Sequence, residues 1–151
     1  MAIPDMTSAG LLPPGVHDAT LPEVEQVFGS RNEHRVELFQ KFTQFLKVAR
    51  SFGLFPAVIT DGSFVTDKDA PGDIDAVLLL PRADLAKLTG HPNRLQILDQ
   101  HAVKSQYGVH LFVDPFPAGP WTSFFQHLKP ADALARKLPP TTRRGVLKVT
   151  L

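Results

Sequence analysis

Residues 74–80, with the sequence IDAVLLL, restrict the fold of this chain more than any other segment. After Ile74 and Asp75 every side chain in the run is apolar, which is typical of a strand that is covered on both faces. A strand of this kind belongs inside a sheet on which other elements pack. We therefore expect helices on both sides of a β-sheet that contains residues 74–80.

Two helices are expected before this strand. The segment 20–23 (TLPE) has the form of a capping box, in which Thr20 and Glu23 satisfy free amides, and a short helix should follow to about Phe28. Residues 31–52 carry apolar side chains at steps of three and four, which predicts the main amphipathic helix, ended at Gly53. Its expected apolar face consists of Val36, Phe39, Phe42, Phe45, Leu46, Ala49 and Phe52.

The remaining elements follow from changes in the spacing of apolar residues. Strands are expected at 57–60, at 109–114, where Pro115 should stop the strand, and at 145–151. Helical segments are expected at 82–101, in two pieces interrupted at Gly90 and Pro92, and at 121–128. This alternation of helix and strand predicts an α/β or α+β fold with a small mixed β-sheet flanked by helices.

Residues 20–151 are expected to form a single domain of this fold. Residues 1–19 show little periodicity and predict an extended N-terminal arm that lies on the domain without building it, with Leu11 and Leu12 as the side chains that could pin it.

Composition excludes several classes of function. The chain has 151 residues, with 16 Lys and Arg against 15 Asp and Glu, and this balance argues against general binding of duplex DNA. Because cysteine is absent, thiolate nucleophiles and cysteine-bound metal centres are excluded. Neither a secretory signal nor an apolar run long enough for a membrane helix is expected, so the predicted location is the cytoplasm, with no membrane partner.

The segment 61–77 (DGSFVTDKDAPGDIDAV) carries the residues most suited to chemistry. Gly62 and Ser63 at the start of a short helix would offer amides and a hydroxyl to a phosphate. In an extended chain Asp73 and Asp75 project from one face, roughly 6.6 Å apart at the backbone. Two carboxylates at this spacing can converge on divalent cations such as Mg²⁺, which also binds substrate phosphates.

Asp114 is the third acidic candidate, because it ends an apolar strand where a charged side chain needs water, a cation or a partner. Two interpretations stay open: it is a third metal ligand, or it is a strand-end carboxylate that accepts hydrogen bonds from loop amides. His110 lies on the same face of the predicted strand as Asp114, so it is a candidate for a group that contacts an acceptor substrate.

Other residues are candidates for contacts with a ligand, but each of them can also be explained as an ordinary surface or core residue. The candidate phosphate contacts are Lys68, Lys104, Arg143, Arg144 and Lys148, which could equally be solvated surface residues. Trp121, Phe124 and Phe125 could stack on a base, although aromatic residues at helical spacing more often belong to the core.

Gly62-Ser63, Asp73-Ile74-Asp75-Ala76 and Val113-Asp114 resemble the signature of the polymerase-β-like nucleotidyltransferase superfamily, over residues 57–115. The Gly-Ser-Phe-Val-Thr form of the motif, residues 12–17 and residues 145–148 are similar to small uncharacterised bacterial members that stand alone. This resemblance implies a mixed sheet flanked by helices and a site that binds Mg²⁺ or Mn²⁺ through Asp73, Asp75 and Asp114. It also implies that Asp114 helps to activate an acceptor hydroxyl, and that Gly62 and Ser63 hold a nucleoside triphosphate such as ATP.

Two positions depart from the superfamily pattern. Asp61 stands where many members have a bulky apolar residue, and Asp67-Lys68-Asp69 replaces an arginine-rich stretch. Lys68 is therefore the single positive charge between the two halves of the motif.

The resemblance predicts a metal-dependent enzyme that transfers a nucleoside monophosphate to a hydroxyl of a protein or an RNA. Small members of this kind resemble parts of toxin-antitoxin or defence modules, which implies a partner protein from the same operon. The alternative is a catalytically degenerate nucleotidyltransferase fold that senses nucleotides or binds proteins, and a structural domain with a fortuitous motif is a third hypothesis.

Overall fold

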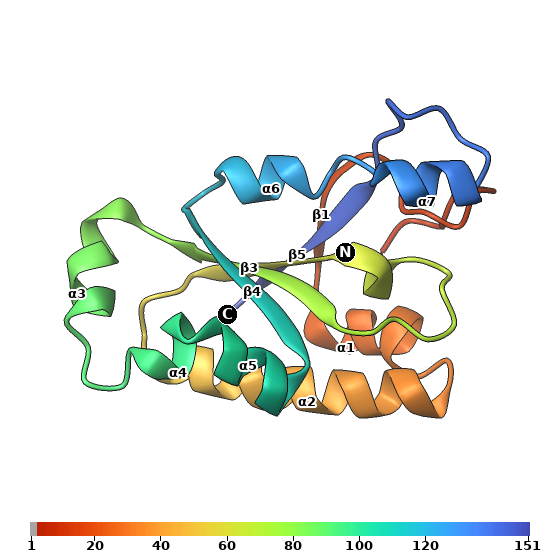
Figure 1. Ribbon diagram of the computed structural model, residues 1–151. Coiled ribbons are helices and arrows are strands. Elements are labelled where there is room, and N and C mark those ends of the chain that lie inside the picture. The colour runs from red at the N-terminus through yellow and green to blue at the C-terminus, as the bar shows by residue number, and fades with distance from the viewer. Residues whose placement is uncertain (1–2) are drawn as a thin grey trace.

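The computed structural model describes residues 3–151, so residues 1 and 2 of the expected arm lie outside the described residues. Within this range the strands form one mixed sheet in the order β1-β5-β2-β3-β4 (Figure 1). They are β1 (Gly15–Ala19), β2 (Ala57–Asp61), β3 (Ile74–Leu80), β4 (Val109–Pro115) and β5 (Gly145–Thr150). β1 is parallel to β5 and β3 to β4, whereas β2 is antiparallel to β3 and β5. The predicted α+β fold with a small mixed sheet is confirmed.

Helices lie on both sides of this sheet (Figure 1). On one side are α1 (Leu21–Val24), α2 (Glu33–Ser51), α4 (Leu95–Leu98) and α5 (Gln100–Tyr107). On the other side are α6 (Pro120–Phe124) and α7 (Pro130–Ala135), while α3 (Leu85–Thr89) follows β3 at one end of the sheet. From residue 3 onward, none of the helices combines the length and the apolar character needed to cross a membrane.

β3 is buried on both faces, as its sequence predicts. Alternate residues of the strand, among them Ile74 and Leu78, join the large hydrophobic cluster that includes the phenylalanines of α2. Val77 and Leu79 point to the other face and join a smaller cluster with Phe125. All seven residues of β3 are therefore removed from water.

The two predicted N-terminal helices are confirmed, with one change on the apolar face of α2. Thr20 forms the capping box with Glu23, and α1 continues as a π-helical turn over Glu25–Gly29. α2 begins after Asn32 and is followed by Gly53, whose φ is +65°. Val36, expected to be buried, is 36% exposed, and the neighbouring Arg35 is completely buried in its place.

Four features differ from expectation. Residues 15–19 of the expected arm are strand β1 at the edge of the sheet, although Leu11 and Leu12 are buried as proposed. Residues 82–101 contain a 3₁₀ turn (Arg82–Asp84), α3, α4 and the start of α5 instead of two pieces. α7 was not predicted, and Pro115 is the last residue of β4 instead of the residue that stops it.

Candidate functional site

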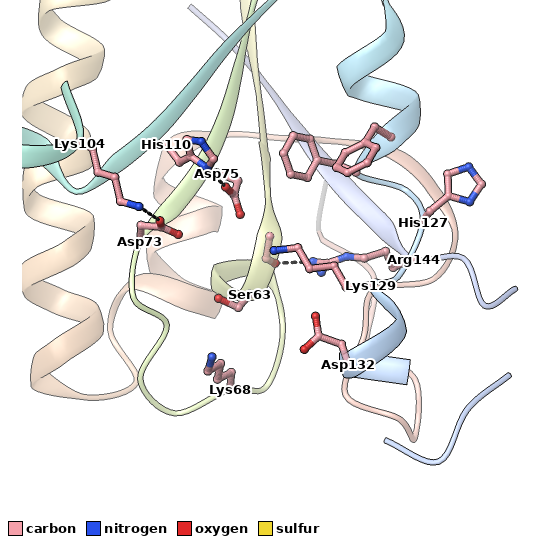
Figure 2. Close-up of a pocket in the computed structure, with 13 residues that line it drawn as sticks. Ser63, Lys68, Asp73, Asp75, Lys104, His110, His127, Lys129, Asp132 and Arg144 are labelled. Carbon is pink, nitrogen blue, oxygen red and sulfur yellow. Dashed lines mark hydrogen bonds and ion pairs between the residues drawn. The ribbon is translucent and has the colours of Figure 1, made fainter. Parts of the chain in front are cut away.

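A pocket of about 400 Å³ opens where β2 ends and β3 begins (Figure 2). Its wall combines residues that the sequence predicted with residues that only the fold brings there. Gly62, Ser63, Lys68, Asp73 and Asp75 come from the predicted motif. Lys104, His110, Phe124, Phe125, His127, Lys129, Asp132 and Arg144 come from α5, β4 and the C-terminal third of the chain.

Gly62 allows the two halves of the motif to approach each other. It follows β2 directly and begins a 3₁₀ turn, Gly62–Val65, with φ at +77°, a backbone conformation that side chains disfavour. A Cβ atom at this position would overlap the carboxylate of Asp75. Glycine is therefore needed here both for the turn and for the close approach of Asp75, which places Ser63 beside the acidic residues.

Asp75 occupies the centre of the site because three strands meet at its position. The sheet register pairs it with Asp61 on β2 and with His110 on β4. Nδ1 of His110 lies 3.1 Å from Oδ1 of Asp75. Burial, and next the negative charge of Asp73, raise the pKa of Asp75 above its ordinary value.

Asp73, Asp75 and His110 form one cluster of candidate metal ligands. Their ligand atoms, one from each residue, lie within 4.8 Å of one another. Asp73 also forms an ion pair of 3.3 Å with Nζ of Lys104, which reaches across from α5 (Figure 2). The two predicted carboxylates are thus brought together, and the third candidate ligand beside them is the imidazole of His110.

Asp114 occupies a different place from the one that a third metal ligand would need. Because β3 and β4 are parallel, Asp114 pairs with Leu79, four residues and roughly 13 Å of strand from the level of Asp75. Its carboxylate accepts hydrogen bonds from the amides of Trp121 and Thr122 and from the Thr122 hydroxyl, at 2.7–3.2 Å. The interpretation as a strand-end carboxylate that binds amides is confirmed, and its role is to hold the start of α6.

Asp61 lies on the same sheet face as Asp75 and is completely buried. Within the described part of the chain neither of its carboxylate oxygens has a hydrogen-bond partner. Burial, and next the charge of Asp75, raise the pKa of Asp61 well above its ordinary value. The nearby Arg144 donates to the carbonyl of Gly62, and burial lowers its pKa. Asp61, one of the two departures from the superfamily pattern, thus adds a buried acidic group directly beside Asp75.

Among residues 3–151, four lysine and arginine side chains line the pocket. Lys68, Lys104 and Arg144, three of the predicted phosphate contacts, line it together with Lys129. Lys129 was missed because it precedes α7, an element without an apolar pattern. The other two candidates lie elsewhere: Arg143 forms a β-bridge with His127, and Lys148 lies over the Phe116 ring.

The loop that carries Lys68 is held by Arg35, a residue that the sequence did not single out. Its guanidinium donates to the carbonyls of Phe28, Phe64 and Thr66 and, at 2.5–3.1 Å, to that of Lys68. Burial is the main reason that the pKa of Arg35 falls to about 10, which still leaves it charged at neutral pH. An arginine of α2 therefore fixes the path of the chain between the two halves of the motif.

Aromatic side chains form the wall of the pocket next to α6. Phe125 is buried, as expected if it belongs to the core. Phe124, in contrast, is 53% exposed and lines the pocket. Trp121 packs on Phe112 with the ring centroids 4.3 Å apart and does not line this pocket. One of the three aromatic candidates, Phe124, is therefore both at the site and open to a ligand.

The fold and the pocket define an α+β protein with a cluster of carboxylates and imidazole at the junction of β2 and β3. The chain belongs to the family described as "Family of unknown function (DUF6932)", whose model matches residues 4–150. No curated protein and no solved structure matches this chain.

Proposed function

We propose that this chain is a metal-dependent nucleotidyltransferase, which transfers a nucleoside monophosphate from a nucleoside triphosphate to a hydroxyl of a protein or an RNA. The observation that carries the proposal is the meeting of Ser63 with Asp73, Asp75 and His110 in a single pocket. A volume of about 400 Å³ is within the range of small-molecule sites.

The donor set of the pocket fits a divalent cation. Asp73 and Asp75 each offer a carboxylate oxygen and His110 offers a ring nitrogen, with these atoms within 4.8 Å of one another. A bound cation would neutralise phosphate charge and favour ionisation of an acceptor hydroxyl. Mg²⁺ and Mn²⁺ are the candidates, since both accept carboxylate ligands.

The remaining polar groups of the pocket suit the phosphates of a nucleotide. Lys68, Lys129 and Arg144 supply positive charge, and the hydroxyl of Ser63 supplies a hydrogen-bond donor. Lys104 is 57% exposed at its side chain, so it can leave Asp73 for a phosphate when a cation binds that carboxylate. Holding the triphosphate and neutralising its charge is the main work of a phosphoryl-transfer site.

Label transfer in a lysate of the source cells tests this function. Each α-labelled nucleoside triphosphate is supplied with Mg²⁺ or Mn²⁺ to the wild type, to an Asp73→Ala/Asp75→Ala variant and to an Asp18→Ala control. Asp18 is an exposed residue of β1. We expect label in a macromolecule with the wild type and the control only, and protease or nuclease digestion then names the acceptor as protein or RNA. Equal labelling by the double variant would refute the proposal.

A second function is favoured by the position of Asp114. Since this carboxylate holds α6, the site has two metal-binding carboxylates and an imidazole where the resemblance implies three carboxylates. A fold that binds nucleotides without turnover, as a sensor or an interaction module, would tolerate that change. Metal-dependent nucleotide binding without any label transfer would support this second function.

A further inference from the structure

We propose that His110 is a metal ligand, and that it makes the site select Mn²⁺ over Mg²⁺. The inference deepens the proposed function, because it rests on the metal site at Asp73 and Asp75, but its test requires no nucleotide. It concerns the kind of ion that these residues hold.

The geometry of His110 suits direct coordination. Two ligands on adjacent corners of an octahedral ion, each about 2.1 Å from it, lie roughly 3.0 Å apart. Nδ1 of His110 and Oδ1 of Asp75 are separated by 3.1 Å, and an oxygen of Asp73 completes a set within 4.8 Å. One ion can therefore contact all three side chains with only small movements.

The imidazole is held in this place before any ion arrives. The parallel register of β3 and β4 puts His110 directly beside Asp75. The ring of Phe112, two residues along the same face, packs against it with the centroids 4.5 Å apart. A ligand that is already oriented loses little conformational entropy when it binds a metal.

The chemistry of the donors then favours Mn²⁺. Mg²⁺ prefers oxygen ligands, whereas imidazole is a good ligand for first-row transition ions. Mn²⁺ accepts carboxylates as Mg²⁺ does and stands above it in affinity for nitrogen donors. Because Asp114 lies at the other end of β4, the carboxylate that would have favoured Mg²⁺ is replaced by His110 at the level of Asp75.

A buried acidic side chain beside Asp75 is an independent observation that points to a cation. Asp61 is the cross-strand neighbour of Asp75 on the same face. It is fully buried, and among residues 3–151 neither of its oxygens has a hydrogen-bond partner. A divalent ion at Asp75 would offset the repulsion that opposes ionisation of both carboxyl groups.

Electron paramagnetic resonance of Mn²⁺ added to the nucleotide-free protein tests the inference. We expect bound Mn²⁺ with a ¹⁴N coupling from the imidazole, and displacement by Mg²⁺ only in large excess. In His110→Asp the ¹⁴N coupling should vanish, and the preference for Mn²⁺ over Mg²⁺ should fall about tenfold, within the range in which even outer-shell partners act. His127→Asn, which changes another histidine of the pocket, should keep the coupling.

The other outcomes overturn the inference and separate it from the proposed function. Bound Mn²⁺ without ¹⁴N coupling in the wild type would show that His110 is not a ligand, even if label transfer with Mg²⁺ shows that the enzyme is active. Absence of Mn²⁺ binding would overturn the metal site itself. A His110→Gln variant with a native circular dichroism spectrum distinguishes loss of the ligand from loss of the fold.

Discussion

Replacing Arg35 with methionine should lower the free energy of unfolding by about 3–5 kcal/mol. Its guanidinium donates to three buried carbonyls, those of Phe28, Phe64 and Thr66. A buried carbonyl that loses its partner costs about 1–3 kcal/mol. Arg31 also donates to the Thr66 carbonyl, at 3.3 Å, so we count the carbonyls of Phe28 and Phe64, which gives roughly 2–6 kcal/mol. The carbonyl of Lys68 is only partly buried. Water can therefore enter from that side, and Arg31 also donates to this carbonyl, so it adds little to the cost and we expect a loss in the middle of the range.

Urea denaturation followed by far-ultraviolet circular dichroism measures this loss. Arg35→Lys is the matched control, because it keeps the charge but not the planar set of donors, and it should cost less than Arg35→Met. In a folded Arg35→Met variant the loop that carries Lys68 should also be cleaved faster by proteases. A loss below about 1 kcal/mol for Arg35→Met would refute the reasoning, because typical surface substitutions already reach about half of that value.

Three further predictions follow from single positions. Gly62→Ala should abolish metal binding, because its Cβ atom would overlap Asp75. Gly53→Ala is the control: Gly53 also has a positive φ but has open space around it, so this variant should lose stability and keep metal binding. Equal metal binding by the two variants would contradict this prediction. Asp114→Ala removes the acceptor of three hydrogen bonds at α6 and should cost about 2–3 kcal/mol, while label transfer by the folded variant stays near the wild-type rate. Asp61→Asn should stabilise the metal-free protein more at pH 7 than at pH 4. Because its pKa is raised, the Asp61 carboxyl keeps its proton in the native protein. The wild type therefore loses stability as the pH rises above about 3.9, the pKa of an aspartate in the unfolded chain. A stability difference between the two proteins that does not change with pH would refute this prediction.

Local patterns in the sequence predicted most of the sheet and its main helix. The apolar run of β3 gives its bounds directly, because a strand buried on both faces has no polar alternation. The capping box and the apolar spacing likewise predicted α1 and α2. Each of these elements is encoded within the few residues that form it.

Elements stabilised by distant residues escaped prediction. β1 has an alternating, half-exposed pattern and joins the sheet by pairing with β5, about 130 residues away. Arg35 is buried because carbonyls of a loop some 30 residues later surround it, and nothing in α2 itself signals this. Local sequence contains no information on partners so far along the chain.

The part of the candidate site that comes from the segment 61–77 was predicted from the sequence. Gly62, Ser63, Asp73 and Asp75 meet because the turn and the antiparallel pairing of β2 with β3 bring them together. The choice between His110 and Asp114 depends on the direction of β4, since a parallel strand places its first residues beside the start of β3. The shared strand face of these two residues was predicted, but the direction of the strand was not.

The most direct test of nucleotidyl transfer supplies the same triphosphate labelled at the α or at the γ phosphorus in parallel reactions. If the pocket at Asp73 and Asp75 transfers nucleoside monophosphate, the α label will remain on the acceptor and the γ label will leave as pyrophosphate. Transfer of the γ label to the acceptor would contradict the account, because it would make the protein a phosphotransferase.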